Sequence, residues 1–201
     1  MILYVESNFI LELAYLQEEH ANCERILKLA REGVVQLILP AFAIAEPYSA
    51  WVGRKKRRQA VHTELTRELR ELGRSEPYAG APEQFQDVTK ALLVSGEEEK
   101  NRLDESIESV LQACSLIPLE ADTIRTAIDI QLTTGLGPQD SIIYASVLSH
   151  LLNVAPGEHK YFVTKNSKDF DNPDITDELG RYHCELCTSF GEAYGIVHQG
   201  N

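Results

Sequence analysis

Short apolar runs that alternate with longer helical patterns constrain the fold of this chain most strongly. Each run has the length and composition of a buried strand, and apolar residues at helical spacing fill most of the sequence between the runs. Strands that alternate with helices favour an α/β fold, in which helices cover both faces of a mostly parallel sheet. The expected strands are residues 2–5, 34–39, 114–118, 160–164 and 184–187.

A strand pattern is missing from a long middle section of the sequence, residues 52–112. Apolar residues recur there at helical spacing in two arms. The break between the arms, at residues 75–82, contains two prolines and a glycine. We therefore predict a helical hairpin inserted into a single domain that spans residues 1–201.

The charge of the chain is unevenly distributed. A formal net charge of −12 argues against a protein that grips nucleic acid with its whole surface. Residues 54–74 nevertheless carry eight Lys and Arg against three Glu, and residues 97–108 carry six acids against two bases. The basic arm either follows an RNA backbone or pairs with acids on its own arm and on the acidic arm. The candidate RNA-binding residues are Arg54, Lys55, Lys56, Arg57 and Arg58.

The sequence contains no apolar stretch that approaches the roughly 20 residues needed to span a membrane. Its first residues lack the basic start and the cleavage site of a secretory signal. We therefore expect a cytoplasmic protein without a membrane partner. Four cysteines are too few for a disulfide scaffold in a chain of this length, and Cys184 and Cys187 are interpreted as ordinary strand residues.

Four acidic residues stand close to the expected strand ends. Glu6 directly follows the first strand, and Glu46 lies in an apolar helical stretch soon after the second. Asp140 opens an apolar helix, and Asp169 follows the fourth strand. Because the carboxyl ends of parallel strands meet at one edge of the sheet, these acids are expected to converge there.

Converging carboxylates repel one another unless cations neutralise them, and hard oxygen ligands suit Mg²⁺ or Mn²⁺. Such an ion can orient a phosphodiester and activate a water molecule. Three of these acids also have a simpler interpretation, whereas Glu46 lies in an apolar run, where an acid normally needs a partner. Glu6 is then a solvated charge, Asp140 complements a helix dipole, and Asp169 belongs to a loop anchored by Phe170. The other candidates for the fourth position are Asn166, Asp171 and Asp174.

In this order the motifs resemble the PIN domain family of metal-dependent ribonucleases, which includes many toxins of toxin–antitoxin pairs. The resemblance covers about residues 1–51 and 113–198. Glu6 stands where the family usually has Asp, and Pro47 is expected to bend the helix that contains Glu46. The matching segments are Tyr4-Val5-Glu6-Ser7-Asn8, Leu39-Pro40-Ala41 followed by Glu46, Gly137-Pro-Gln-Asp140 with the apolar residues after it, and Val163-Thr164-Lys165-Asn166-Ser167-Lys168-Asp169-Phe170.

The resemblance implies a three-layer α/β/α sandwich that cuts RNA internally with Mg²⁺ or Mn²⁺. It also implies a protein antitoxin that inserts a basic side chain into the acidic pocket, and it leaves a homodimer open. Carried over by position, the metal-binding and catalytic residues are Glu6, Glu46, Asp140 and Asp169. The residues that support them are Ser7, Asn8, Thr164 and Asn166.

Two other functions stay open from the sequence. One is a catalytically degenerate PIN-fold module that binds RNA or a protein partner without cutting. The other is a metal-dependent phosphohydrolase on another doubly wound fold. That class favours a nucleophilic Asp with a second Asp two residues later, whereas Ser7 and Asn8 follow Glu6 here, and a glycine-rich phosphate loop is missing.

Overall fold

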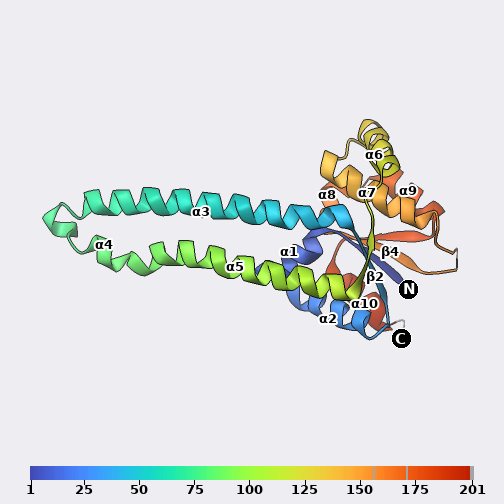
Figure 1. Cartoon of the computed structure of the whole chain (residues 1–201), viewed down its shortest axis with the longest axis horizontal. Helices are drawn as coiled ribbons and strands as arrows, with labels where there is room; N and C mark the ends of the chain where they lie inside the picture. Colours follow the sequence, from blue (N-terminus) through green and yellow to red (C-terminus); the bar gives the residue numbers. More distant parts are fainter. Residues whose placement is uncertain (156, 171, 200–201) are drawn as a thin grey trace.

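A computed structural model describes residues 1–155, 157–170 and 172–199, and a parallel sheet of five strands forms its centre (Figure 1). The strands lie in the order β3-β2-β1-β4-β5, and every neighbouring pair is parallel. All four residues of β1 are buried, as expected of a central strand covered on both faces. The bounds are β1 Ile2–Val5, β2 Gln36–Pro40, β3 Cys114–Ile117, β4 Lys160–Val163 and β5 Cys184–Cys187.

The chain builds this sheet outwards from β1 in two directions. Strands β2 and β3 follow on one side of β1, and β4 and β5 lie on the other side. The order therefore reverses between β1 and β4, and ligands of such folds bind beyond the carboxyl ends of the strands at this reversal. Val5 and Val163 are paired in register at the ends of these two strands. They lead directly into Glu6 and Thr164, two of the predicted site residues.

Helices cover both faces of the sheet and confirm the expected three-layer α/β/α sandwich (Figure 1). In one layer Phe9 meets Phe190 edge-on, with 5.3 Å between the ring centroids. In the other layer Tyr144 packs near Phe162 of β4, with 6.5 Å between the centroids. The first layer contains α1 Ser7–Tyr15, α2 His20–Arg31 and α10 Phe190–Gln199, and the second contains α6 Ala121–Thr134, α7 Pro138–Leu151 and α9 Pro173–Arg181.

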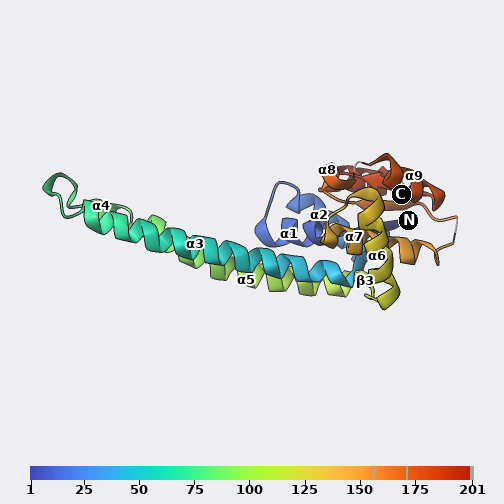
Figure 2. The same cartoon turned by 90° about the horizontal axis from the view of Figure 1, so that it is seen from above.

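Two long helices form a hairpin that projects far from the sheet (Figures 1 and 2). They are α3 (Ala45–Leu72) and α5 (Gln86–Ala113). The connection between them contains η2 (Glu76–Tyr78), which lies within the predicted break at residues 75–82, and α4 (Ala81–Gln84), which extends two residues beyond it. α3 follows η1 (Ala41–Ile44) and continues past residue 52 without interruption, and α5 ends directly before β3. The arms of the hairpin are therefore continuous with the body, where α3 begins and α5 ends. None of the described helices combines the length and apolar character that a membrane span requires.

Some local predictions from the sequence need correction. Pro47 was expected to bend its helix, but it lies in the first turn of α3, where backbone N–H groups have no partner within the helix. The sequence pattern also misses α8 (Ser167–Phe170) and α9, which follow β4. Asn172 caps α9 by accepting a hydrogen bond from the backbone N–H of Asp174 at 3.0 Å.

Candidate functional site

Glu6 is a buried carboxylate at the point where β1 passes into α1. Only 4% of the residue is exposed, and it is the N-cap of α1. Its Oε2 accepts hydrogen bonds from the Asn8 backbone N–H and the Ser7 hydroxyl, each at 2.8 Å, and Oε1 accepts one from Thr164 Oγ1 at 3.2 Å. Burial raises the pKa of Glu6, and these hydrogen bonds partly offset the effect. Ser7, Asn8 and Thr164 thus hold the Glu6 carboxylate in one orientation.

The Ser7 hydroxyl joins Glu6 to Glu46. Ser7 Oγ lies 2.8 Å from Glu6 Oε2 and 2.6 Å from Glu46 Oε2. Because a hydroxyl group has one proton to donate, it satisfies both carboxylates only when one of them carries a proton and donates in return. Glu46 is half-buried in the first turn of α3, where the helix N-terminus favours negative charge. The structure therefore brings these two acids together from separate elements.

Asp140 lies in the first turn of α7 and faces the same edge of the sheet. The side-chain amide of Asn166 lies 3.4 Å from Asp140 Oδ1. Burial raises the pKa of Asp140, and the hydrogen bond from Asn166 lowers it. The charges of Asp169 and Glu46 raise the pKa further, which requires these carboxylates to lie near Asp140. Asp140 therefore has a hydrogen-bond partner, Asn166, and acidic neighbours in addition to the N-terminus of α7.

Asp169 is the most exposed of the four acids and belongs to α8. The next residue, Phe170, is buried and packs edge-on against Phe162, with 5.1 Å between the ring centroids. Asp169 also lines a hollow of about 440 Å³ between the end of α6 and the start of α9. Asp174, an alternative for the fourth position, is exposed in the first turn of α9, and Asp171 lies outside the described residues.

The four acids have the donor chemistry of a hard-cation site. Among the described residues, no Lys or Arg forms an ion pair with Glu6, Glu46, Asp140 or Asp169. Carboxylates of this kind are the ligands that Mg²⁺ and Mn²⁺ prefer. Within the described part of the chain, however, no group of three or more His, Cys, Asp or Glu side chains is placed to hold a metal ion. Metal binding would require these side chains to move closer together, so the metal and catalytic roles stay predictions.

An ion pair between a buried carboxylate and a partly exposed lysine, which the motif pattern does not single out, fixes the segment after β4. Lys165 Nζ lies 2.5 Å from Glu12 Oε1. The Glu12 side chain is 1% exposed, and its Oε2 accepts a hydrogen bond from the Glu19 backbone N–H at 2.7 Å. Because Lys165 stands between Thr164 and Asn166, this pair holds two predicted site residues against α1. The available sequence signal was an acid inside the apolar stretch of α1.

The candidate RNA-binding residues lie in the middle of α3. Lys55 pairs with Glu97 at 2.6 Å, and Arg58 pairs with Glu99 at 2.7 Å. Both acids belong to α5, so these two cations join the arms of the hairpin. This agrees with the alternative in which the basic arm pairs with acids instead of binding RNA. The remaining three candidates do not form ion pairs within the described residues, and Arg54 contacts an aromatic ring of α1.

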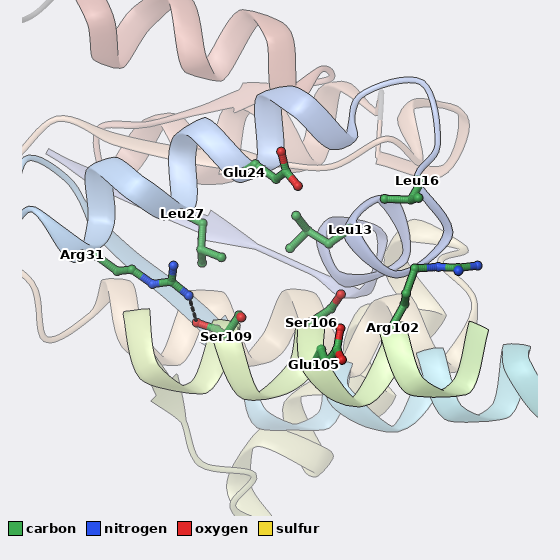
Figure 3. A pocket seen from close by; sticks show the side chains of 9 residues that line it. All are labelled: Leu13, Leu16, Glu24, Leu27, Arg31, Arg102, Glu105, Ser106 and Ser109. Atoms are coloured by element: carbon green, nitrogen blue, oxygen red, sulfur yellow. Dashed lines mark hydrogen bonds between the residues drawn. The ribbon is translucent and has the colours of Figure 1, made fainter. Parts of the chain in front are cut away.

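A separate hollow of about 410 Å³ lies between α1, α2 and α5 (Figure 3). Leu13 and Leu27 supply apolar surface to it, and Arg31 donates a hydrogen bond to the backbone carbonyl of Ser109 at 3.4 Å across one end. Arg102 donates to a backbone carbonyl of α1 at 3.2 Å. The described residues that line the hollow include none of the predicted acids Glu6, Glu46, Asp140 and Asp169. This hollow is therefore distinct from the edge of the sheet where those acids lie, which is called the acidic edge below.

Comparison with known proteins adds a family assignment. The sequence matches the PIN domain over residues 3–170. No curated protein sequence matches the chain. Among solved structures, a chain from the crystal structure of VapBC2 from Rickettsia felis bound to a DNA fragment from their promoter is similar, with a TM-score of 0.46 and 13% sequence identity. The alignment covers 92% of this chain and 98% of that chain, and at this TM-score the likeness carries no functional weight.

Proposed function

The chain belongs to the PIN domain family, and from this premise we propose that it is an endoribonuclease that depends on Mg²⁺ or Mn²⁺. It would hydrolyse phosphodiester bonds of RNA at the acidic edge of the sheet. The observation that carries the proposal is the bridge from the Ser7 hydroxyl to Glu6 and Glu46. Asp140, whose pKa is raised by burial and by neighbouring carboxylates, stands beside this bridge.

The residues of this edge have separable tasks in the proposed reaction. Glu6, Glu46 and Asp140 would hold the divalent ion, and Asp169 or Asn166 would complete the site, directly or through water. When bound, the ion supplies an activated water and neutralises charge on the phosphate. Asn8, Ser7 and Thr164 keep Glu6 oriented through the hydrogen bonds described above, and they would limit its movement during the reaction.

The test is cleavage of a mixed RNA pool in the presence of Mn²⁺. We expect Asp140→Asn and Glu46→Gln each to lower the cleavage rate by about 100-fold or more, because misplaced reacting groups carry penalties of that size. Asp129→Asn is the matched control, since Asp129 is an exposed acid on α6 that does not line the acidic edge. Circular dichroism should show unchanged helix content in all three variants. Equal cleavage by wild type and both site variants would refute the assignment.

A second candidate is a PIN-fold module that binds RNA or a protein partner without cutting. Two observations favour it. Both oxygens of Glu6 already accept hydrogen bonds from protein groups, and the described residues do not form a ready metal-holding group. Purified wild type that binds RNA but releases no metal-dependent products would support this module and overturn the nuclease.

We also propose a protein antitoxin as a partner, one that inserts a Lys or Arg side chain between the acids. The support is the absence of a paired cation at Glu6, Glu46 and Asp140 within the described residues. If the partner acts in this way, Glu46→Gln should weaken its binding and Asp129→Asn should not. A homodimer and a cytoplasmic location stay predictions from the sequence.

A further inference from the structure

The helix that carries Glu46 also carries the basic residues of the hairpin. α3 runs without a break from Ala45 to Leu72, with Glu46 in its first turn. The helix projects from the body beside α5 (Figures 1 and 2). An RNA strand that is bound at the acidic edge and extends along α3 would therefore pass the basic residues at distances that the helix fixes.

Three of the five basic candidates are engaged within the protein. Lys55 and Arg58 pair with acids of α5, as described above. The guanidinium of Arg54 lies over the ring of Tyr15, with 4.0 Å between its central carbon and the ring centroid. These contacts fasten the two arms to each other and to α1, and they leave these three side chains less available to a ligand.

Lys56 and Arg57 are exposed, and neither forms an ion pair among the residues that the structure describes. Arg57 follows Glu46 by 11 residues, so the two side chains lie on one face of the helix, roughly 16 Å apart along its axis. Ala50 and Gly53 stand between them on this face, and a Cβ placed on Gly53 would meet no atom within 4 Å. The helix surface at Gly53, between the acid and the arginine, is therefore open.

We propose that Arg57, with Lys56 beside it, binds a backbone phosphate of the RNA strand whose scissile bond lies at the acidic edge. A net charge of −12 disfavours RNA binding by the protein as a whole, so cations that do not form internal ion pairs offer the local attraction. The guanidinium of an exposed arginine also matches a phosphate with two parallel hydrogen bonds. The placement relative to the cut bond rests on the proposed function.

The first experiment measures binding of fluorescein-labelled single-stranded RNA in EDTA, where cutting does not occur. We expect Arg57→Glu to raise Kd by about 10-fold and to reduce the salt dependence of binding by about one phosphate contact. The matched control is Arg70→Glu, the same change at an exposed residue nearer the tip of α3 that is also free of ion pairs within the described residues. Its Kd should change by less than about 2-fold.

The second experiment varies substrate length in the Mn²⁺ cleavage assay. Arg57→Glu should lower kcat/KM for an oligonucleotide that spans the roughly 16 Å from Glu46 to Arg57. It should leave kcat/KM unchanged for a dinucleotide, which cannot reach Arg57. Equal effects on both substrates, equal weakening of binding by the two arginine variants, or no RNA binding by wild type would each overturn the inference. Wild type that binds RNA through Arg57 but cuts nothing would instead overturn the proposed nuclease.

Discussion

Replacing Lys165 with methionine would leave the buried Glu12 carboxylate without its cation. The two side chains lie 2.5 Å apart, Glu12 is 1% exposed and Lys165 is 30% exposed. Breaking a fully buried pair by removing one partner costs about 3–5 kcal/mol. Because water reaches the ammonium group and Glu12 also accepts a hydrogen bond from Glu19, we expect a smaller loss of about 2–3 kcal/mol for Lys165→Met.

Urea unfolding and thermal melting would measure this loss. A loss of this size lowers Tm by about 4–12 °C in a chain of about 200 residues. Lys168→Met is the matched control, because Lys168 is an exposed lysine on the same segment that forms no ion pair among the described residues. Its effect should stay within about 0.5 kcal/mol.

A double-mutant cycle with Glu12→Gln isolates the pair itself. Glutamine keeps an acceptor for the Glu19 N–H but carries no charge, so the lysine and glutamate changes should not add. We expect a coupling free energy of about 1.5–3 kcal/mol, which is within the range for contacting residues. The two effects adding to within about 0.5 kcal/mol would show that Lys165 and Glu12 act independently and would refute the reasoning.

Three further predictions concern pH, thiol reactivity and one turn. Burial raises the pKa of Glu6 above its ordinary value, so its contribution to stability is complete below pH 4.5 and is lost as pH rises through the folded-state pKa. In metal-free protein, Tm should therefore decrease less between acidic and alkaline pH in Glu6→Gln than in wild type. The same decrease of Tm in both proteins would contradict this. Burial raises the pKa of Cys184 and of Cys187 to about 12, so iodoacetamide at pH 8 should label both only after unfolding, and rapid labelling of the folded protein would contradict it. Gly135 has φ +75° with open space around it, so Gly135→Ala should destabilise the protein by about 1 kcal/mol. Gly195→Ala, in the interior of α10, should instead be neutral or stabilising. A decrease of Tm in both variants would contradict this.

The sequence by itself determined the sheet and its acidic edge. A parallel strand covered on both faces has to be apolar along its whole length, and β1 shows this pattern both in the sequence and in its burial. Residues that directly follow such strands share an edge whatever the details of packing. The sequence alone therefore places Glu6 and Thr164 at the same edge, although 158 positions separate them.

Tertiary structure alone decided how the charged groups are used. The sequence did not distinguish among the five candidate RNA-binding residues, but the pairing of the two arms engages Lys55 and Arg58 and leaves Arg57 exposed. The Glu12–Lys165 pair likewise depends on how α1 packs against the segment after β4. Composition and local periodicity do not encode such choices, because the energy of an ion pair depends on the distance and burial of groups that the fold brings together.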